Sequence, residues 1–151
     1  MGYVADIRKQ VGHQPLVIAY SVMIVFDQKK GLLMEERTDD GFWDFPGGSI
    51  EFNESAEKAA ERELKEETGL NAVSYGLLKV YSGPVTLYRY VNGDVVSGVD
   101  VVYLCTKWKG REKPQKEEVR SLRWFPLSED PKPFSARNVL ILADLRKKLI
   151  L

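Results

Sequence analysis

The sequence predicts an α/β fold in which helices pack on a mixed β-sheet. Several segments are apolar and rich in β-branched residues, as strands are, while one strongly helical segment lies in the middle of the chain and another near its C-terminal end. No repeat, low-complexity segment or linker divides the 151 residues, of which 44% are hydrophobic and 29% are charged. This length and composition fit one globular domain spanning residues 1–151.

The first third of the chain predicts a short helix followed by a hairpin. Residues 3–11 place apolar side chains at helical spacing. Residues 16–26 are β-branched and apolar and are bounded by a proline and the turn DQKKG, so they predict a buried central strand with residues 31–36 as its hairpin partner. Residues 38–49 (TDDGFWDFPGGS) then predict an ordered loop whose aromatic side chains pack on a surface.

The rest of the chain predicts a helix, a run of strands and a second helix. The segment 54–68 is rich in Ala, Glu, Lys and Leu, and Gly69 provides a helix C-cap. An Asn-Gly-Asp sequence predicts a hairpin turn between two of the strands that follow. The expected strands cover residues 70–81, 85–91, 95–107 and 122–125, and the expected amphipathic helix covers 136–149.

Composition argues against several classes of function. The 22 basic and 22 acidic residues give a formal net charge of +0 at pH 7, which argues against a general nucleic-acid binder. The longest apolar run, 16–26, is about half the length that crosses a bilayer, so no membrane partner is expected. Cys105 is the single cysteine, which excludes an internal disulfide or a Cys-cluster zinc site. We therefore expect a cytoplasmic protein.

The helix expected over residues 54–68 carries carboxylates where its buried face should be. At about 100° per residue, Glu63 and Glu67 fall on the side of the alanines, and Glu66 falls at the edge of that side. Ion pairs along a solvated helix explain the opposite side, but unpaired buried carboxylates are costly. A hard divalent cation such as Mg²⁺ takes carboxylate oxygens and is commonly completed by substrate phosphate. This pattern alone leaves a solvated helix and a metal-binding helix both open.

The spacing of these residues resembles a known family. Residues 48–70 contain Gly48, Glu54, Arg62-Glu63-Leu64, Glu66-Glu67 and Gly69-Leu70 at the spacing of the box that defines the Nudix hydrolases, and WDFPGG at 43–48 is similar to the entry into that box. The resemblance implies a three-layer α/β/α sandwich with a mixed sheet. It also implies Mg²⁺- or Mn²⁺-dependent hydrolysis of a nucleoside diphosphate linked to another moiety.

The same resemblance assigns roles to residues of this chain. It implies that Glu63, Glu66 and Glu67 are metal ligands and catalytic residues, with the backbone carbonyl of Gly47 also pointing at the metal. It further implies that Glu54 and Arg62 pair to brace the loop against the helix, which supports the site together with Gly48. Glycines suit a place where a metal meets main-chain carbonyls.

Other candidate site residues lie outside the box. Glu118 lies in KEEVRSLRWFPL, which resembles the family segment where a glutamate precedes the final strand, so Glu118 is a candidate general base; a solvated loop charge is the alternative. Arg37 is a candidate for contacting substrate phosphate, and Phe42 or Trp43 for stacking on a base. A satisfied salt bridge and ordinary core packing explain these three residues equally well.

The sequence leaves the substrate and the assembly open. Within the family a proline after the box indicates ADP-ribose hydrolysis and a tyrosine farther on indicates dinucleoside polyphosphates, and Pro84 and Tyr88 lie near these two positions. We expect ADP-ribose or a related nucleotide sugar, with oxidised nucleoside triphosphates or dinucleoside polyphosphates as the alternative. A Nudix-fold module that senses a nucleotide without cleaving it is the non-enzyme alternative. A homodimer is also expected, joined through the N-terminal segment or the apolar face of the C-terminal helix.

Overall fold

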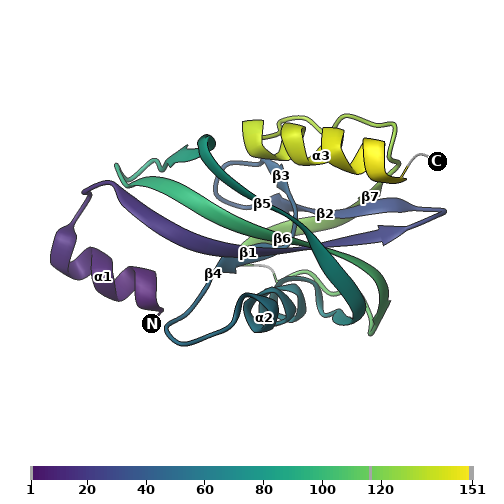
Figure 1. Ribbon diagram of the computed structural model, residues 1–151, viewed down its shortest axis with the longest axis horizontal. Coiled ribbons are helices and arrows are strands. Elements are labelled where there is room, and N and C mark those ends of the chain that lie inside the picture. Colours follow the sequence, from purple (N-terminus) through teal and green to yellow (C-terminus); the bar gives the residue numbers. More distant parts are fainter. Residues whose placement is uncertain (1, 116, 150–151) are drawn as a thin grey trace.

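The computed structural model describes residues 2–115 and 117–149 and shows a mixed sheet with helices on both faces (Figure 1). Helices α2 and α3 cover opposite faces, which makes a three-layer α/β/α arrangement, and α1 stands beside one end of the sheet. In chain order the elements are α1 (Tyr3–Val11), β1 (Leu16–Asp27), β2 (Gly31–Arg37), β3 (Trp43–Asp44), β4 (Gly47–Ser49), α2 (Ala56–Thr68), β5 (Asn71–Arg89), β6 (Val95–Lys109), β7 (Val119–Phe125) and α3 (Ala136–Leu149).

Strand β1 organises the sheet. It pairs in parallel with β6 and antiparallel with both β2 and β4. The strand order along the sheet is β3-β2-β1-β6-β5, with β4 added to β1 and β7 added to β2. The parallel pairing of β1 with β6, next to antiparallel pairings, makes the sheet mixed, as the sequence predicts. Because β4 is only three residues long and joins the middle of β1, it brings the Pro-Gly-Gly sequence to the centre of the molecule.

Successive side chains of β1 point to opposite faces of the sheet, so they divide the core between α2 and α3. Val22 and Ile24 belong to the cluster that includes Ile141, Leu142 and Leu145 of α3, and Met23 and Val25 belong to the cluster that includes Ala60 and Leu64 of α2. The run 16–26 is therefore apolar on both faces because a helix covers each face. In the described part of the chain, no helix is long and apolar enough to span a membrane.

The ends of α2 follow from its sequence. The helix begins at Ala56, two residues later than expected, because Ser55 is its N-cap: the Ser55 side chain accepts a hydrogen bond from the Lys58 N–H at 3.1 Å. It ends where Gly69 takes a left-handed conformation with φ of 80°, as the C-cap prediction requires. The expected helices over 3–11 and 136–149 have the predicted bounds.

Two expectations about strands are wrong. Residues 70–81 and 85–91 are not separate strands, since β5 runs through both and pairs with β6 along its length. The pairing register shifts at the segment that contains Gly83 and Pro84. The segment 38–49 is not wholly a loop, because it contains β3 and β4. Short edge pairings of two or three residues carry too little periodicity to be seen in the sequence.

Candidate active site

Helix α2 turns two of its three predicted carboxylates toward the sheet. Glu67 is buried, on the same helix face as Ala60 and Leu64, and Glu63 is half-buried. Glu66 lies at the edge of this face, exposed, with its Oε2 atom 3.3 Å from an Arg62 nitrogen. The carboxylates that interrupt the apolar pattern of the sequence thus lie at the inner face of α2 and along its edge.

Glu67 joins α2 to β4 and faces a second buried carboxylate. Its Oε1 accepts a hydrogen bond from the Gly47 N–H at 2.8 Å. Burial raises the pKa of Glu67, and the neighbouring charges of Glu35 and Glu63 raise it further. Glu35 of β2 is 3% exposed, and its Oε2 has no hydrogen-bond partner among the described residues. Burial, and then the charge of Asp44, raises the pKa of Glu35. A buried carboxylate pair of this kind requires a proton or a cation between its members.

The two glycines of β4 let the backbone approach these carboxylates. A Cβ at position 48 would overlap the carboxylate of Glu63, and a Cβ at position 47 would lie 2.6 Å from the backbone oxygen of Ser21. Glycine is therefore required at both positions by close packing. Burial raises the pKa of Glu63, and the Arg62 guanidinium opposes this shift.

Arg62 holds the loop before α2 against the helix. Its Nε and one terminal nitrogen donate to the two Glu54 carboxylate oxygens at 2.8 and 2.9 Å, so the contact expected between these residues is present and bidentate. The other terminal nitrogen donates to Glu63 Oε1 at 2.8 Å. Arg62, which is anchored by Glu54, thus fixes the position of Glu63.

Glu118 lies at the margin of the carboxylate cluster formed by Glu35, Glu63 and Glu67. It is exposed, in the turn before β7, and its backbone oxygen accepts a hydrogen bond from the Thr38 N–H at 3.0 Å. Its negative charge is among the influences that raise the pKa of Glu63. Glu118 is therefore near Glu63, while its side chain remains in solvent.

A cavity of about 200 Å³ lies between β4 and the first turn of α3, and Gly47 and Gly48 form part of its wall. Arg37, Phe42 and Trp43 also line it. Trp43 at the same time packs edge-to-face on Phe125 of the core, with ring centroids 4.9 Å apart. Arg37 donates to Asp39 at 2.8 and 3.0 Å. Trp43 therefore packs in the core and Arg37 forms a salt bridge, and both side chains also line the cavity.

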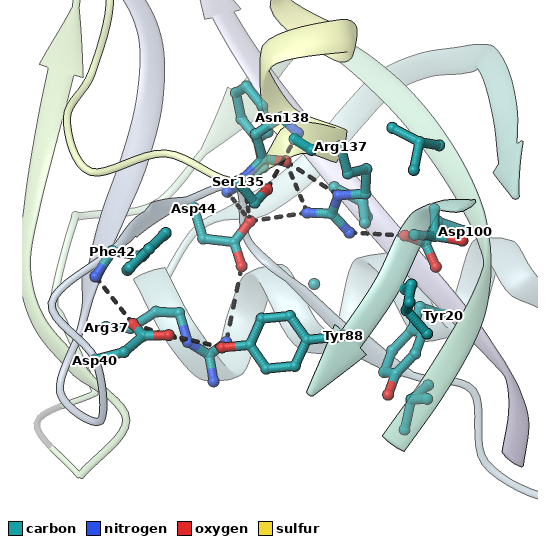
Figure 2. Close-up of a pocket in the computed structure, with 18 of the residues that line it drawn as sticks. Tyr20, Arg37, Asp40, Phe42, Asp44, Tyr88, Asp100, Ser135, Arg137 and Asn138 are labelled. Carbon is teal, nitrogen blue, oxygen red and sulfur yellow. Dashed lines mark hydrogen bonds and ion pairs between the residues drawn. The ribbon is translucent and has the colours of Figure 1, made fainter. Parts of the chain in front are cut away.

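The deep wall of the cavity is a buried network centred on Arg137 (Figure 2). The guanidinium donates to Asp44 Oδ1 at 2.8 Å and to Asp100 Oδ2 at 3.0 Å, and two of its nitrogens donate to Asn138 Oδ1. The Asn138 amide donates in turn to Asp44 Oδ1 at 2.8 Å. Strand β3, strand β6 and the first turn of α3 are thereby joined at one point, which gives this wall a fixed shape.

A second contact crosses the opposite side of the cavity. Tyr88 of β5 donates its hydroxyl hydrogen bond to Asp40 Oδ2 at 2.7 Å, and the two residues are 48 positions apart in the sequence. Figure 2 shows this pair near Arg37 and Phe42, below the Arg137 network. The turn at residues 38–42 is therefore attached to β5 at the cavity wall.

The chemistry of the carboxylate cluster fits a hard divalent cation. Glu35 Oε2 is a buried acceptor without a partner among the described residues, and the negative charge of Glu63 raises the pKa of Glu67. Oxygen ligands of this type suit Mg²⁺ or Mn²⁺. Within residues 2–115 and 117–149 no three such ligands are yet gathered around one point, since Glu66 is turned toward Arg62. Holding a cation therefore requires side-chain rotation at the surface of α2.

The sequence did not identify some residues of the carboxylate cluster and of the cavity wall. Glu35 continues the apolar run of β2, and Asp100 interrupts the apolar run of β6. A charged residue at an inward position of a strand was the available signal in both cases. Arg137 and Asn138 gave no such signal, because polar residues are ordinary in the first turn of a helix.

Comparisons with known proteins identify relatives of this chain. A protein from Homo sapiens named 8-oxo-dGDP phosphatase NUDT18 is 34% identical over 136 residues, which is 85% of this chain and 38% of that protein. One from Methanocaldococcus jannaschii named ADP-ribose pyrophosphatase is 33% identical over 111 residues, which is 72% of this chain and 62% of that protein. The chain thus spans less than two thirds of the length of either relative.

A solved structure and a family model also match this chain. The crystal structure of a MutT NUDIX hydrolase from Burkholderia pseudomallei superposes with a TM-score of 0.72 at 24% identity, over 87% of this chain and 98% of that one. The family model of the NUDIX domain matches residues 15–145, which contain the carboxylate cluster and all but the last turn of α3. The chain therefore belongs to the NUDIX domain family.

Proposed function

We propose that this protein hydrolyses a phosphoric anhydride bond in a nucleoside diphosphate linked to another moiety, with the help of Mg²⁺ or Mn²⁺. The observation that carries the proposal is the position of β4: Gly47 and Gly48 line the cavity and at the same time contact Glu67 and border Glu63. A nucleotide in the cavity would have its phosphates next to the carboxylate cluster. This is the arrangement that metal-assisted phosphate chemistry needs.

The residues of α2 and β4 supply the metal ligands in this proposal. Glu63, Glu66 and Glu67 offer carboxylate oxygens, and the Gly47 carbonyl offers a fourth oxygen. A divalent cation bound by them neutralises phosphate charge and lowers the pKa of bound water. Arg62 keeps Glu63 in place through its pairing with Glu54.

A carboxylate must accept the proton of the attacking water. Glu118 is our candidate, since it is exposed, unlike the buried Glu67, and lies near Glu63. Its side chain is free to rotate toward a bound substrate. The box glutamates are the alternative bases.

Two substrate classes have support. The sequence favours ADP-ribose or a related nucleotide sugar, and the archaeal relative is named for ADP-ribose. Oxidised guanine nucleotides are the second class, and the human relative is named for 8-oxo-dGDP. Both classes contain a nucleoside diphosphate, so both place the same bond beside the carboxylate cluster.

A hydrolysis screen tests this proposal. Purified protein is incubated with ADP-ribose, other nucleotide sugars, dinucleoside polyphosphates, capped RNA ends, and oxidised and normal nucleoside di- and triphosphates, each with Mg²⁺, Mn²⁺ or chelator. We expect cleavage of at least one class, at the anhydride bond and only with metal. Tight nucleotide binding without turnover of any substrate would replace this proposal by the sensing module.

The homodimer and the cytoplasmic location expected from the sequence remain proposals. Leu142 and Leu145 are buried against the sheet, so this part of α3 caps the sheet, while Val139 and Leu140 of the same helix are exposed. The exposed apolar side chains of β5, which include Leu77 and Val80, offer another surface for a second copy. Light scattering at high micromolar concentration is expected to give twice the mass of the chain, and a monomer there would remove the dimer.

A further inference from the structure

The turn at residues 38–42 contacts the turn that carries Glu118. The Thr38 N–H donates to the Glu118 backbone oxygen at 3.0 Å, and the Thr38 hydroxyl donates to the Glu117 backbone oxygen at 2.8 Å. Thr38 and Glu117 are 79 positions apart in the sequence, and they meet because β2 and β7 pair antiparallel directly beside them. Thr38 therefore binds both peptide groups that flank Glu118.

The turn at residues 38–42 is itself fixed. The Gly41 N–H donates to the Arg37 backbone oxygen at 3.0 Å, which closes the turn, and the Arg37 guanidinium lies 3.8 Å from the Asp40 carboxylate. Asp40 also accepts the hydrogen bond from the Tyr88 hydroxyl of β5 at 2.7 Å, a contact that is visible in Figure 2. A turn that is held by its own bonds and by β5 can support another segment.

The backbone of Glu118 is also held from the side of α2. Its N–H donates to the side-chain oxygen of Gln115 at 3.0 Å, and the Gln115 N–H donates to the backbone oxygen of Glu67 at 3.2 Å. Because peptide groups are planar, contacts to the two peptides that flank a residue set the direction of its Cα–Cβ bond. The backbone contacts with Thr38 and Gln115 therefore decide which space the exposed Glu118 carboxylate can reach.

We infer that Thr38 is a positioning residue that keeps the Glu118 carboxylate within reach of the attacking water. A general base has to lie within hydrogen-bond distance of the proton that it removes, and a displacement of about 1 Å can lower a rate about 100-fold. Without the Thr38 hydroxyl, the peptide before Glu118 loses its contact with β2, so productive positions of the carboxylate become rarer. The inference rests on the proposed function, since it assumes that Glu118 acts as the base in anhydride hydrolysis.

Replacing Thr38 by Val tests this inference, since valine has nearly the same shape but no hydroxyl, and the backbone N–H bond to Glu118 stays. With the best substrate from the screen, kcat is expected to fall about threefold to tenfold, the range for one hydrogen bond. KM and the Mg²⁺ concentration for half-maximal rate should not change. Thr38→Ser keeps the hydroxyl and should retain the wild-type kcat. Thr106→Val is the matched control, since Thr106 is exposed on β6.

A double-mutant cycle separates the positioning of Glu118 from a general structural role of Thr38. In the Glu118→Gln protein there is no carboxylate to position, so adding Thr38→Val should change kcat by less than about twofold. A loss in this background as large as in wild type would overturn the inference, because Thr38 would then act independently of Glu118. A Glu118→Gln protein that keeps wild-type turnover would overturn it too, since Glu118 would not be the base.

Failure of this inference is distinguishable from failure of the proposed function. Anhydride cleavage with the wild-type kcat in Thr38→Val, or with a loss that Thr38→Ser shares, would remove the inference and leave the proposed function standing. Absence of cleavage for every substrate of the screen would remove the proposed function and this inference with it.

Discussion

Replacing Glu67 by Gln is expected to stabilise the metal-free protein while it removes the response to metal. Glutamine keeps the acceptor for the Gly47 N–H and supplies an N–H donor for the unpartnered Glu35 oxygen, without the proton that the two buried carboxylates otherwise need between them in the absence of metal. The gain of one hydrogen bond to a charged group is worth about 1–3 kcal/mol. For a chain of this size it corresponds to a rise in melting temperature of about 3–10 °C.

Thermal melting in chelator and in millimolar Mg²⁺ or Mn²⁺ measures both effects. The wild-type protein is expected to melt higher in metal than in chelator, because a cation that binds only the folded state stabilises it by mass action. Glu67→Gln should melt higher than wild type in chelator and gain little from metal. Glu66→Gln is the control in chelator, because the exposed Glu66 should change stability by less than about 0.5 kcal/mol. A Glu67→Gln protein that is less stable than wild type in chelator, or that keeps the full metal response, refutes this reasoning.

Three further outcomes follow from the same geometry. In chelator the free energy of unfolding should fall as pH rises from about 4.3, the pKa of glutamate in the unfolded chain. The reason is that the raised pKa values of Glu35 and Glu67 let the folded state keep protons that the unfolded chain has lost. Urea unfolding at several pH values measures this free energy, and a flat profile contradicts the prediction. Gly48→Ala should lower turnover at least about 100-fold, because its Cβ overlaps the neighbouring carboxylate, while Gly76→Ala, in open space, should retain wild-type turnover. Glu118→Gln should lower turnover by about 10² to 10⁴ with little change in metal affinity, and near wild-type turnover across pH would return the base role to the box glutamates.

The sequence predicted the parts of the molecule that have a long local pattern. Helix α2 was predictable because its composition, its cap at Gly69 and the face shared by Glu63 and Glu67 all lie within one segment. The central strand was predictable because an apolar run on both faces requires cover on both sides. The contact between Glu54 and Arg62 came from the family resemblance.

The rest depends on contacts between distant segments. Glu35 joins the carboxylate cluster only because β2 lies beside β1 and β3, and Asp100 meets Arg137 across 37 positions of sequence. Neither contact leaves a periodic signal. A glutamate or aspartate at an inward strand position marks such residues as candidates, but only the fold shows what they face.

The metal dependence of turnover tests the central claim most directly, namely that the carboxylates around Gly47 and Gly48 form a hydrolytic metal site. The rate of anhydride cleavage is measured against Mg²⁺ concentration for wild type and for Glu67→Gln, with the best substrate from the screen. The account predicts no turnover of wild type in chelator, a saturable rise with Mg²⁺, and a rate for Glu67→Gln lower by at least about 100-fold, which excess metal restores only in part. Wild-type turnover that continues in chelator, or a Glu67→Gln protein with the wild-type metal profile, would contradict it.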